Sequence, residues 1–354
     1  MAQLVYSSSP HVKSPRTTRR IMIDVCIALL PACIAGCVLL GLANPTNGWL
    51  SLMLIAISCL SAVASEFVFL LCCKKSFKTI LHEFDFTSLV TGLLIGMNLY
   101  PTSKWYAALL ASVFAVVVVK MLFGGTGKNI VNPAIAGRIF AFIAFGAAFG
   151  GVMHFNQGDS ATTVVSPITN GAVTAGSTPL QTLFNGGSNT LTNVDLLLGT
   201  GVAGCIGEIC KIALIAGGIY LVIRGVLNFR WPLVYIAATG VTAVIIALIG
   251  GSSFVDALEI FLPSILSGGL ILGAIFMATD YVTTPNTKLG NYIYFVLLGV
   301  LTAVLRKAVK GEAVSFAILL MNLLVPLFDR YIRRKPFGYV KPVKEKKSKQ
   351  KEGE

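Results

Sequence analysis

The sequence predicts an all-α membrane protein of about ten transmembrane helices, arranged in two inverted five-helix repeats with short broken or half-spanning helices. Hydrophobic residues make up 55% of its 354 residues and charged residues only 12%, against about 25% charged in an average soluble domain. Several apolar runs reach the roughly 20 residues that a helix needs to cross about 30 Å of hydrocarbon. Alternating ten-residue strand patterns, typical of membrane barrels, are absent from the sequence. The spans are therefore expected to be helices.

Ten apolar segments are expected to enter or cross the membrane, five on each side of one long polar loop. They cover residues 21–43, 48–73, 87–100, 104–123, 130–152, 196–223, 232–250, 255–279, 291–306 and 313–332. The third is short and ends before Pro101, which pushes Tyr100 out of helical geometry, so this segment is expected to stop partway or re-enter. The predicted organisation is a basic N-terminal segment (1–20), a first membrane half (21–152), an exterior loop (153–195), a second membrane half (196–332) and a basic tail (333–354).

Basic residues predict the orientation, because lysine and arginine beside a span are retained in the cytoplasm. Both ends of the chain are rich in them, which places both termini inside and demands an even number of spans. No lysine or arginine occurs between Ile139 and Cys210, so the loop 153–195 is expected outside. Arg306 and its basic neighbours fall on the exterior side in this arrangement, so a total of nine spans is the alternative.

The net charge of +13 favours contact with anionic lipid or acidic partner subunits, and no soluble domain is present to bind nucleic acid.

Two similar segments, residues 89–103 and 266–280, lie half a chain apart and align Gly92 with Gly269 and Gly96 with Gly273. They belong to the third and eighth spans, which must run in opposite directions. That pattern is typical of inverted repeats, whose broken helices often meet at the membrane midplane to form a site. Close packing between ordinary helices explains the glycines alone equally well.

The loop 123–138 joins the fourth and fifth spans and carries three glycines followed by Asn132 and Pro133. It lacks the frame of a nucleotide-binding P-loop. Its free backbone N–H groups could cradle a ligand, or its glycines could only permit a tight reversal. Arg138 lies inside the next apolar span, where an arginine costs several kcal/mol unless it is paired or faces a polar cavity.

Other charges inside the apolar spans are few. Glu208 and Lys211 share a helical face and are expected to form a buried ion pair. Asp256 and Glu259 have the same spacing at the outer start of the eighth span, where two acids favour cation binding or proton uptake, or are simply solvated. Asp280 follows that span and is a further candidate for the ion pathway. The eight cysteines show no C-x-x-C spacing, so no metal site is expected.

Four blocks of the chain together resemble one known family. They are "SSSPHVKSPRTTRRIMIDVCIALLPA" (7–32), "GGTGKNIVNPAIAGR" (124–138), "FMATDYVTTPNTKLG" (276–290) and "EAVSFAILLMNLLVPLFDRYIRRKPFG" (312–338). They resemble the NqrB/RnfD family of bacterial cell-membrane subunits. Within this family the blocks are most similar to the members that belong to the Rnf complex, an ion-translocating ferredoxin:NAD⁺ oxidoreductase. The resemblance implies an electron-carrying subunit that moves Na⁺ or H⁺ together with other Rnf subunits, especially the other subunit with covalent FMN. A flavin-free channel or secondary transporter is the alternative, because it shares the repeat architecture.

The same resemblance implies a covalent flavin in the exterior loop. Members of the family hold FMN through a phosphoester to a threonine, in a pattern close to Ser/Thr-Gly-Ala-Thr-Pro-Leu. Here "AGSTPL" matches at Gly176 and Thr178, so Thr178 is the expected acceptor of FMN from a flavin transferase. The pattern departs at Ala175 and Ser177, which leaves Ser177 and Thr174 as alternatives. A second, noncovalent flavin such as riboflavin is implied between the half-spans. Asn132 and Arg138 are further candidates for cofactor binding.

Overall fold

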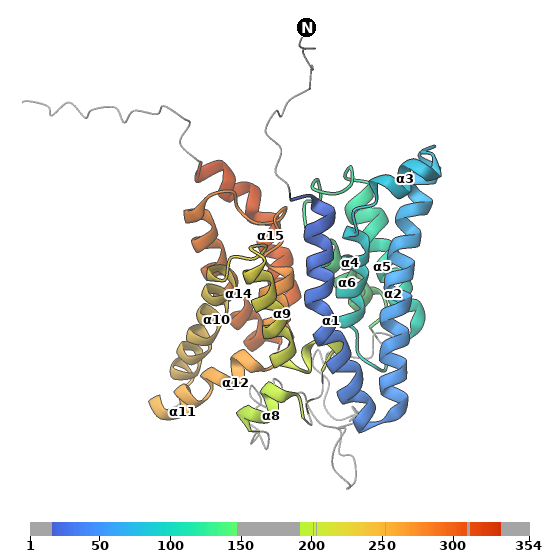
Figure 1. Ribbon diagram of the computed structural model, residues 1–354. Coiled ribbons are helices and arrows are strands. Elements are labelled where there is room, and N and C mark those ends of the chain that lie inside the picture. The colour runs from blue at the N-terminus through green and yellow to red at the C-terminus, as the bar shows by residue number, and fades with distance from the viewer. Residues whose placement is uncertain are drawn as a thin grey trace, which may run out of the picture.

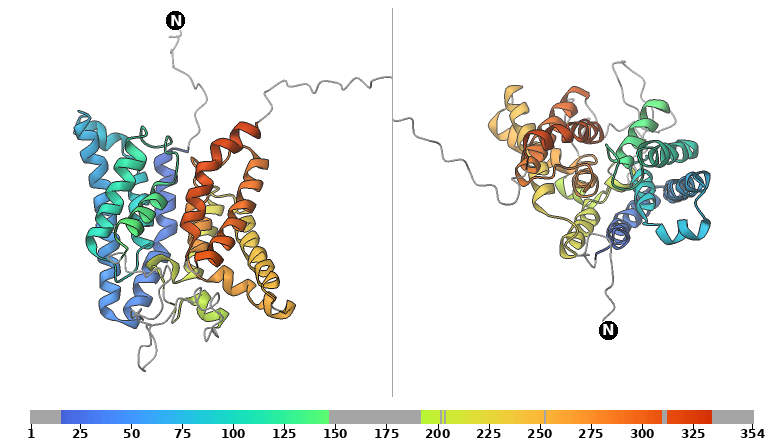
Figure 2. Two further views of the ribbon diagram at one scale, coloured as in Figure 1. Left: turned by 180° about the vertical axis from the view of Figure 1, so that it is seen from behind. Right: turned by 90° about the horizontal axis from the view of Figure 1, so that it is seen from above.

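The computed structural model describes residues 16–146, 192–200, 202, 204–251, 253–309 and 312–333. All regular structure in these ranges is helical. The helices form a bundle in which the first half of the chain lies beside the second half (Figures 1 and 2). Helices α1 (Thr18–Ala43) and α9 (Lys211–Ile223) meet between the halves. They approach so closely that a Cβ on Gly217 would collide with the carbonyl oxygen of Ala28.

The first half contains two long helices followed by shorter ones. They are α1, α2 (Pro45–Cys72), α3 (Phe77–Glu83), α4 (Thr87–Met97), α5 (Trp105–Val113) with its π-helical continuation η1 (Phe114–Met121), and α6 (Pro133–Ala144). Asn44 separates α1 from α2 and caps α2, because its side-chain oxygen accepts the backbone N–H of Thr46 at 3.2 Å.

The second half is more broken. It contains α8 (Asn193–Leu198), the 3₁₀-helix η2 (Ile206–Glu208), α9, α10 (Arg230–Ile249), α11 (Phe254–Glu259), α12 (Phe261–Leu266), α13 (Leu270–Leu272) with its π-helical continuation η3 (Gly273–Met277), α14 (Lys288–Val309) and α15 (Val314–Tyr331). The chain bends by 62° between the segments Phe254–Leu266 and Leu270–Met277.

Five helices of the described part, α1, α2, α10, α14 and α15, are long and apolar enough to cross a membrane, and the bent segment from α11 to η3 makes a sixth if it counts as one span. The helices α4, α5 with η1, α6 and α9 are apolar but shorter. The described part of each of the ten expected segments contains a helix or a broken helix. The chain is thus a helical membrane protein.

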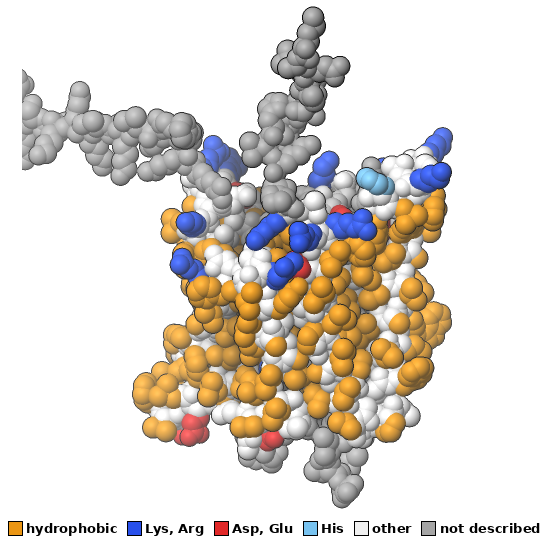
Figure 3. Space-filling model, in the orientation of Figure 1, with side chains coloured by type: hydrophobic (Ala, Val, Ile, Leu, Met, Phe, Trp, Pro, Cys, Tyr) orange, Lys and Arg blue, Asp and Glu red, His pale blue; other side chains and the backbone are white. Residues whose placement is uncertain are grey.

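The face of the bundle that Figure 3 shows is apolar over most of its height. Large hydrophobic side chains face outward, among them Leu42, Leu60 and Ile249, which are 74%, 71% and 82% exposed. Such a continuous apolar surface suits lipid rather than water. Lysine and arginine gather at one end, called here the basic end, where α1 begins and α15 ends (Figures 1 and 3).

Arg306, which disagreed with the expected orientation, is an internal residue and not a flanking charge. Its side chain is 1% exposed and donates to the carbonyl oxygens of Ser264 at 2.8 Å and Ser267 at 3.2 Å. These carbonyls end α12 at the break before α13, where no helical N–H can reach them. Arg306 also pairs with Glu312 at 3.7 Å. It therefore stabilises the broken helix and carries no information about orientation.

The glycines of the two similar segments serve close packing in different surroundings. A Cβ on Gly92 would lie 2.6 Å from the carbonyl oxygen of Ser58, and one on Gly96 would lie 2.8 Å from the Cα of Ile55, so both let α4 lie against α2. A Cβ on Gly273 would meet Val314 of α15 at 2.5 Å. Both interpretations of these glycines, helix packing and internal repeat, are compatible with these contacts.

Candidate functional site

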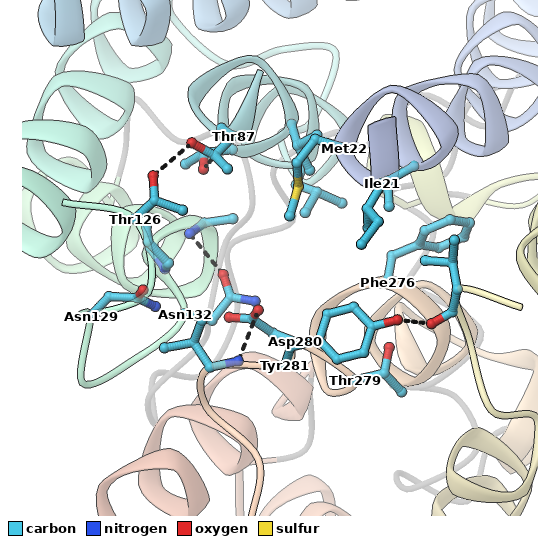
Figure 4. Close-up of a pocket in the computed structure, with 18 of the residues that line it drawn as sticks. Ile21, Met22, Thr87, Thr126, Asn129, Asn132, Phe276, Thr279, Asp280 and Tyr281 are labelled. Atoms are coloured by element: carbon cyan, nitrogen blue, oxygen red, sulfur yellow. Dashed lines mark hydrogen bonds between the residues drawn. The ribbon is translucent and has the colours of Figure 1, made fainter. Parts of the chain in front are cut away.

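A cavity opens between the two halves near the basic end. Its walls come from the start of α1, from α4, from the loop before α6, and from η3 with the turn that follows it. This interhalf cavity is lined by Ile21, Met22, Val25, Thr87, Val90, Thr91, Leu94, Lys120, Thr126, Asn129, Asn132, Leu221, Val226, Ile275, Phe276, Thr279, Asp280 and Tyr281, among others. Figure 4 shows Thr87, Thr126, Asn129 and Asn132 on one side and Ile21, Met22 and Phe276 on the other, with Thr279 and Tyr281 near Phe276.

Asn132 fixes the loop wall of this cavity. Its Oδ1 accepts the backbone N–H of Ala134 at 3.0 Å and so caps α6, whose first residue is Pro133. Its Nδ2 donates to the carbonyl oxygen of Met277 at 3.0 Å and ties the loop to the end of η3. The side-chain amide of Asn132 therefore caps a helix of the first half and is hydrogen-bonded to the end of a helix of the second half.

Asp280 lies in the turn after η3 and faces the same cavity (Figure 4). Its carboxylate accepts the backbone N–H of Val282 and the hydroxyl of Thr283, both at 3.4 Å. Burial raises the pKa of Asp280 above its ordinary value, and the hydrogen bonds from Val282, Thr283 and Asn129 offset only part of that shift. The structure thus brings together two of the candidate residues, Asn132 and Asp280.

The helix geometry around the cavity is irregular. Both η1 and η3 are π-helices, and they contribute Lys120 and Phe276 to the lining. Short π-helical segments often occur at functional sites, because the extra residue in the turn displaces side chains from their regular positions. No pattern in the sequence signals either segment.

Lys120 and Glu66 form a buried ion pair beside the cavity, and sequence reasoning missed both residues. Lys120 Nζ lies 2.9 Å from Glu66 Oε1, and the two side chains are 3% and 9% exposed. The ammonium also donates to the hydroxyls of Thr87 and Ser88 at the start of α4. Two opposite charges in apolar spans are the signal that could have found them, because each requires a partner there.

Arg138 lies outside the cavity lining, in a second polar region. It is 7% exposed, and its Nη1 donates to Asn98 Oδ1 at 2.9 Å and to Ser315 Oγ at 2.8 Å. Its Nη2 lies 3.6 Å from the sulfur of Cys205. The expectation that this arginine needs polar partners is confirmed, and these partners come from the end of α4, from α15 and from the segment before η2.

The expected ion pair between Glu208 and Lys211 is wrong in its geometry. The ammonium of Lys211 donates to the backbone carbonyl oxygen of Glu208 and not to its carboxylate. The carboxylate turns back to the N–H of Cys205, which its Oε1 accepts at 2.8 Å, because that group opens η2 and needs an acceptor. Glu208 is 5% exposed, and its Oε2 has no hydrogen-bond partner among the described residues.

Glu312 completes this region by accepting the N–H of Gly269 at 2.9 Å. A Cβ on Gly269 would lie 2.9 Å from Glu208 Oε2, so both carboxylates approach the break between α12 and α13. We call the set Asn98, Arg138, Glu208, Lys211, Arg306, Glu312 and Ser315 the central polar cluster.

The other candidates lie elsewhere. Asp256 and Glu259 are exposed on α11, at the end opposite the basic end (Figure 1), and the structure does not bring them to the cavity or to the central polar cluster. Thr174, Gly176, Ser177 and Thr178 lie outside the described residues. Across the described ranges, no group of three or more histidine, cysteine or acidic residues is placed to hold a metal ion.

Comparison with known proteins finds relatives that are named as subunits of ion-translocating oxidoreductase complexes. The D subunit of the Na(+)-translocating ferredoxin:NAD(+) oxidoreductase complex of Acetobacterium woodii is 36% identical over 348 residues, 98% of each chain. The D subunit of the proton-translocating ferredoxin:NAD(+) oxidoreductase complex of Clostridium ljungdahlii is 33% identical over 334 residues, 94% of this chain and 95% of its own. The D subunit of an ion-translocating oxidoreductase complex of Alcanivorax borkumensis is 32% identical over 351 residues, 95% of this chain and 97% of its own.

The match extends over almost the whole chain and includes every element that lines the cavity. Residues 5–338 match the NQR2, RnfD, RnfE family. The resemblance expected from the four sequence blocks is confirmed: the chain belongs to the NQR2, RnfD, RnfE family.

Proposed function

We propose that this chain is the electron-carrying, ion-translocating membrane subunit of an Rnf-type ferredoxin:NAD⁺ oxidoreductase complex. The names of relatives that cover nearly the whole chain support the complex. The observation that carries the proposal is the interhalf cavity, whose lining includes Asn132 from the first half of the chain and Asp280 from the second. We further propose a bacterial cell-membrane location with the basic end in the cytoplasm.

The cavity fits a noncovalent flavin by the chemistry of its lining. A flavin ring has two broad apolar faces and one edge of alternating acceptors and an N–H donor. Ile21, Met22 and Phe276 offer apolar contact for the faces. Asn129 and Asp280 supply polar groups for the edge, while Asn132 holds the wall in place. Few, well-placed polar groups in an apolar cavity are typical of a cofactor site.

A bound flavin would supply reversible electron transfer, and the chain would supply its surroundings. Burial raises the pKa of Asp280, which favours the protonated carboxyl group relative to an exposed aspartate. The Lys120–Glu66 pair and the hydroxyls of Thr87 and Ser88 anchor the start of α4 beside the cavity. Apolar side chains from α1 and α4 would shield the faces of a bound ring from water.

The inverted repeat is part of the proposal. Helix α4 begins with Thr87 at the cavity, and the residue after it, Asn98, binds Arg138. The segment from Gly269 to Asp280 runs from the central polar cluster back to the cavity. Arg138 and Ser315, which bind each other, are 177 positions apart, the same separation as Gly92 and Gly269. Contact between equivalent positions is expected near the axis of a twofold repeat.

Electrostatics explains how electron transfer could be coupled to ion movement. An electron that enters a low-dielectric interior adds a negative charge, which is costly unless a cation or proton compensates it. Within the central polar cluster, the Oε2 of Glu208, which has no hydrogen-bond partner among the described residues, offers a place for that cation. We propose that Na⁺ or H⁺ moves between the halves when electrons pass.

The covalent FMN is assigned to Thr178 by its motif "AGSTPL". Mass spectrometry of the subunit from the whole complex tests this: a peptide with Thr178 should carry the FMN mass, and Thr178→Ala should lose it. Thr174→Ala and Ser177→Ala are the matched controls and should keep the adduct. Free flavin released on denaturation tests the cavity. If the purified subunit is colourless, carries neither the covalent nor the noncovalent flavin, and moves a solute by itself, the result would support a channel or transporter instead.

A further inference from the structure

A small hollow beside the interhalf cavity gathers three arginines. It is lined by Arg16, Arg20, Ile21 and Asp24 at the start of α1, and by Arg224 and Val226 after the end of α9. We call it the arginine hollow. Ile21 and Val226 also line the interhalf cavity, so the two spaces are neighbours. The lining residues carry three positive charges and one negative charge.

The carboxylate among the described lining residues is already engaged. Asp24 Oδ1 accepts Arg224 Nη2 at 3.1 Å and Nε at 3.3 Å, and it accepts the hydroxyl of Tyr220 at 3.1 Å. Asp24 is 7% exposed, whereas the Arg224 side chain is 41% exposed. The carboxylate therefore fixes one side of the guanidinium, and the other side faces outward.

The other two guanidinium groups differ in how they are held. Arg16 Nη1 donates to the carbonyl oxygen of Gly225 at 3.0 Å, in the turn that Gly225 makes with a φ of +65°. Arg20 lies on the first turn of α1 and lines the same hollow. Unlike Arg16 and Arg224, its side chain has no hydrogen-bond or ion-pair partner among the described residues. Its neighbour Arg19 is engaged elsewhere, with its guanidinium 5.3 Å from the ring centroid of Phe86.

The hollow lies where the apolar surface gives way to the basic end. Further along α1, Ile23, Ile27 and Leu30 are 36%, 45% and 48% exposed. Lipid head groups lie at such a boundary. Guanidinium groups bind phosphate oxygens through paired N–H donors, and basic pockets between membrane helices bind anionic head groups.

We propose that the arginine hollow binds a phosphate group, with Arg20 and Arg224 donating to its oxygens. Two sources share this chemistry. One is the head group of an anionic phospholipid at the membrane surface, which is independent of the function proposed above. The other is the phosphate of a flavin mononucleotide in the neighbouring cavity, which rests on that function.

Arg20→Gln is the decisive variant, because the Arg20 side chain binds no other described residue and its loss should leave the fold intact. Arg19→Gln is its matched control on the adjacent position. Arg224→Gln would leave Asp24 without its ion-pair partner and is the less specific variant. Arg20→Lys keeps the charge but loses the paired donors, so its binding should fall between wild type and Arg20→Gln.

The whole complex is purified with each variant and moved into nanodiscs of either phosphatidylglycerol or an uncharged, phosphate-free glycolipid. Bound phospholipid is measured by native mass spectrometry, and noncovalent flavin is released by acid and separated into FMN and riboflavin. With a lipid source, Arg20→Gln should weaken phosphatidylglycerol retention about tenfold, since a charge-assisted hydrogen bond is lost, while the flavin stays unchanged. With a flavin source, FMN should be lost to a similar extent and phospholipid should stay.

Equal phospholipid and equal FMN in wild type, Arg19→Gln and Arg20→Gln would overturn the proposal. The covalent adduct on Thr178 and electron transfer by the complex are measured in the same preparations. If the proposed function is wrong, the wild-type complex subunit will itself carry no flavin. If only the phosphate site in the arginine hollow is wrong, the wild type and all variants will keep every flavin.

Discussion

Arg138 and Ser315 bind each other across the junction of the two halves, with 2.8 Å between Nη1 and Oγ. The same guanidinium nitrogen donates to Asn98 at 2.9 Å, so α6, α15 and the end of α4 meet on one buried cation. No carboxylate lies within ion-pair distance of Arg138 among the described residues. The charge is therefore stabilised by neutral hydrogen-bond acceptors and by more distant acids of the central polar cluster.

Replacing this cation should destabilise the junction. Arg138→Met leaves the oxygens of Asn98 and Ser315 without their donor, and each unpaired buried group costs about 1–3 kcal/mol. Ser315→Ala removes one hydrogen bond and should cost about 1 kcal/mol. We expect the thermal denaturation midpoint of the purified complex to fall more for Arg138→Met than for Ser315→Ala. Exposed Lys307→Met is the control and should leave the midpoint unchanged.

Asn132 has two separable functions, and two substitutions distinguish them. Asn132→Ser keeps a side-chain oxygen for the cap of α6 but loses the donor to Met277, and Asn132→Ala loses both. If the link to η3 shapes the cavity, both variants should release noncovalent flavin at least several-fold more readily, measured as flavin retained after gel filtration. Retention by Asn132→Ser and loss by Asn132→Ala would instead assign the effect to the cap.

Hydropathy and proline positions predicted the helices well, because lipid imposes long apolar runs that are easy to recognise. The short α4 is an example: the expected early stop before Pro101 is found at Met97. The sequence predicted broken helices but did not locate the break of the eighth segment at Ser267–Gly269, because it depends on Arg306 and Glu312, about 40 residues away, binding the freed backbone groups. Such long-range partners leave no local pattern.

The candidate site shows the same division. Asn132 and Asp280 were selected from local features, a glycine-rich loop that ends in Asn-Pro and an acid at a helix end, and they do share one cavity. Glu66 and Lys120 were missed, since their pairing joins residues 54 positions apart. Glu208 and Lys211 were paired by helical spacing, yet η2 is a short 3₁₀ turn and α9 begins only at Lys211, so the assumed common helix face does not exist there.

Asp85 should give the protein an acid-sensitive element at the basic end. Burial opposes its ionisation, but hydrogen bonds from Thr87 and Thr126 at 2.6 and 2.8 Å and the charge of Lys120 outweigh it and lower the pKa of Asp85 below 3.8. A lowered folded-state pKa contributes stability above 3.8, and that stability is lost as the pH falls through the folded value. We expect Asp85→Asn to melt below wild type at neutral pH, with the difference shrinking towards pH 3. A constant difference across that range would contradict this assignment.

Glu208 provides the sharpest test of where ions pass. Its Oε2 is buried without a partner among the described residues, beside Gly269 and near Glu312, so this oxygen is available to a proton or a cation that enters the break between α12 and α13. Glu208→Gln keeps the acceptor for the N–H of Cys205 but cannot take up a proton or balance a cation. In proteoliposomes of the whole complex we expect electron transfer within about twofold of wild type and a several-fold loss of Na⁺ or H⁺ uptake per electron. Glu259→Gln, on the exposed surface of α11, is the matched control and should keep full uptake. The reverse result, with Glu259→Gln impaired and Glu208→Gln normal, would move the ion pathway to the acids at the outer end of the bundle.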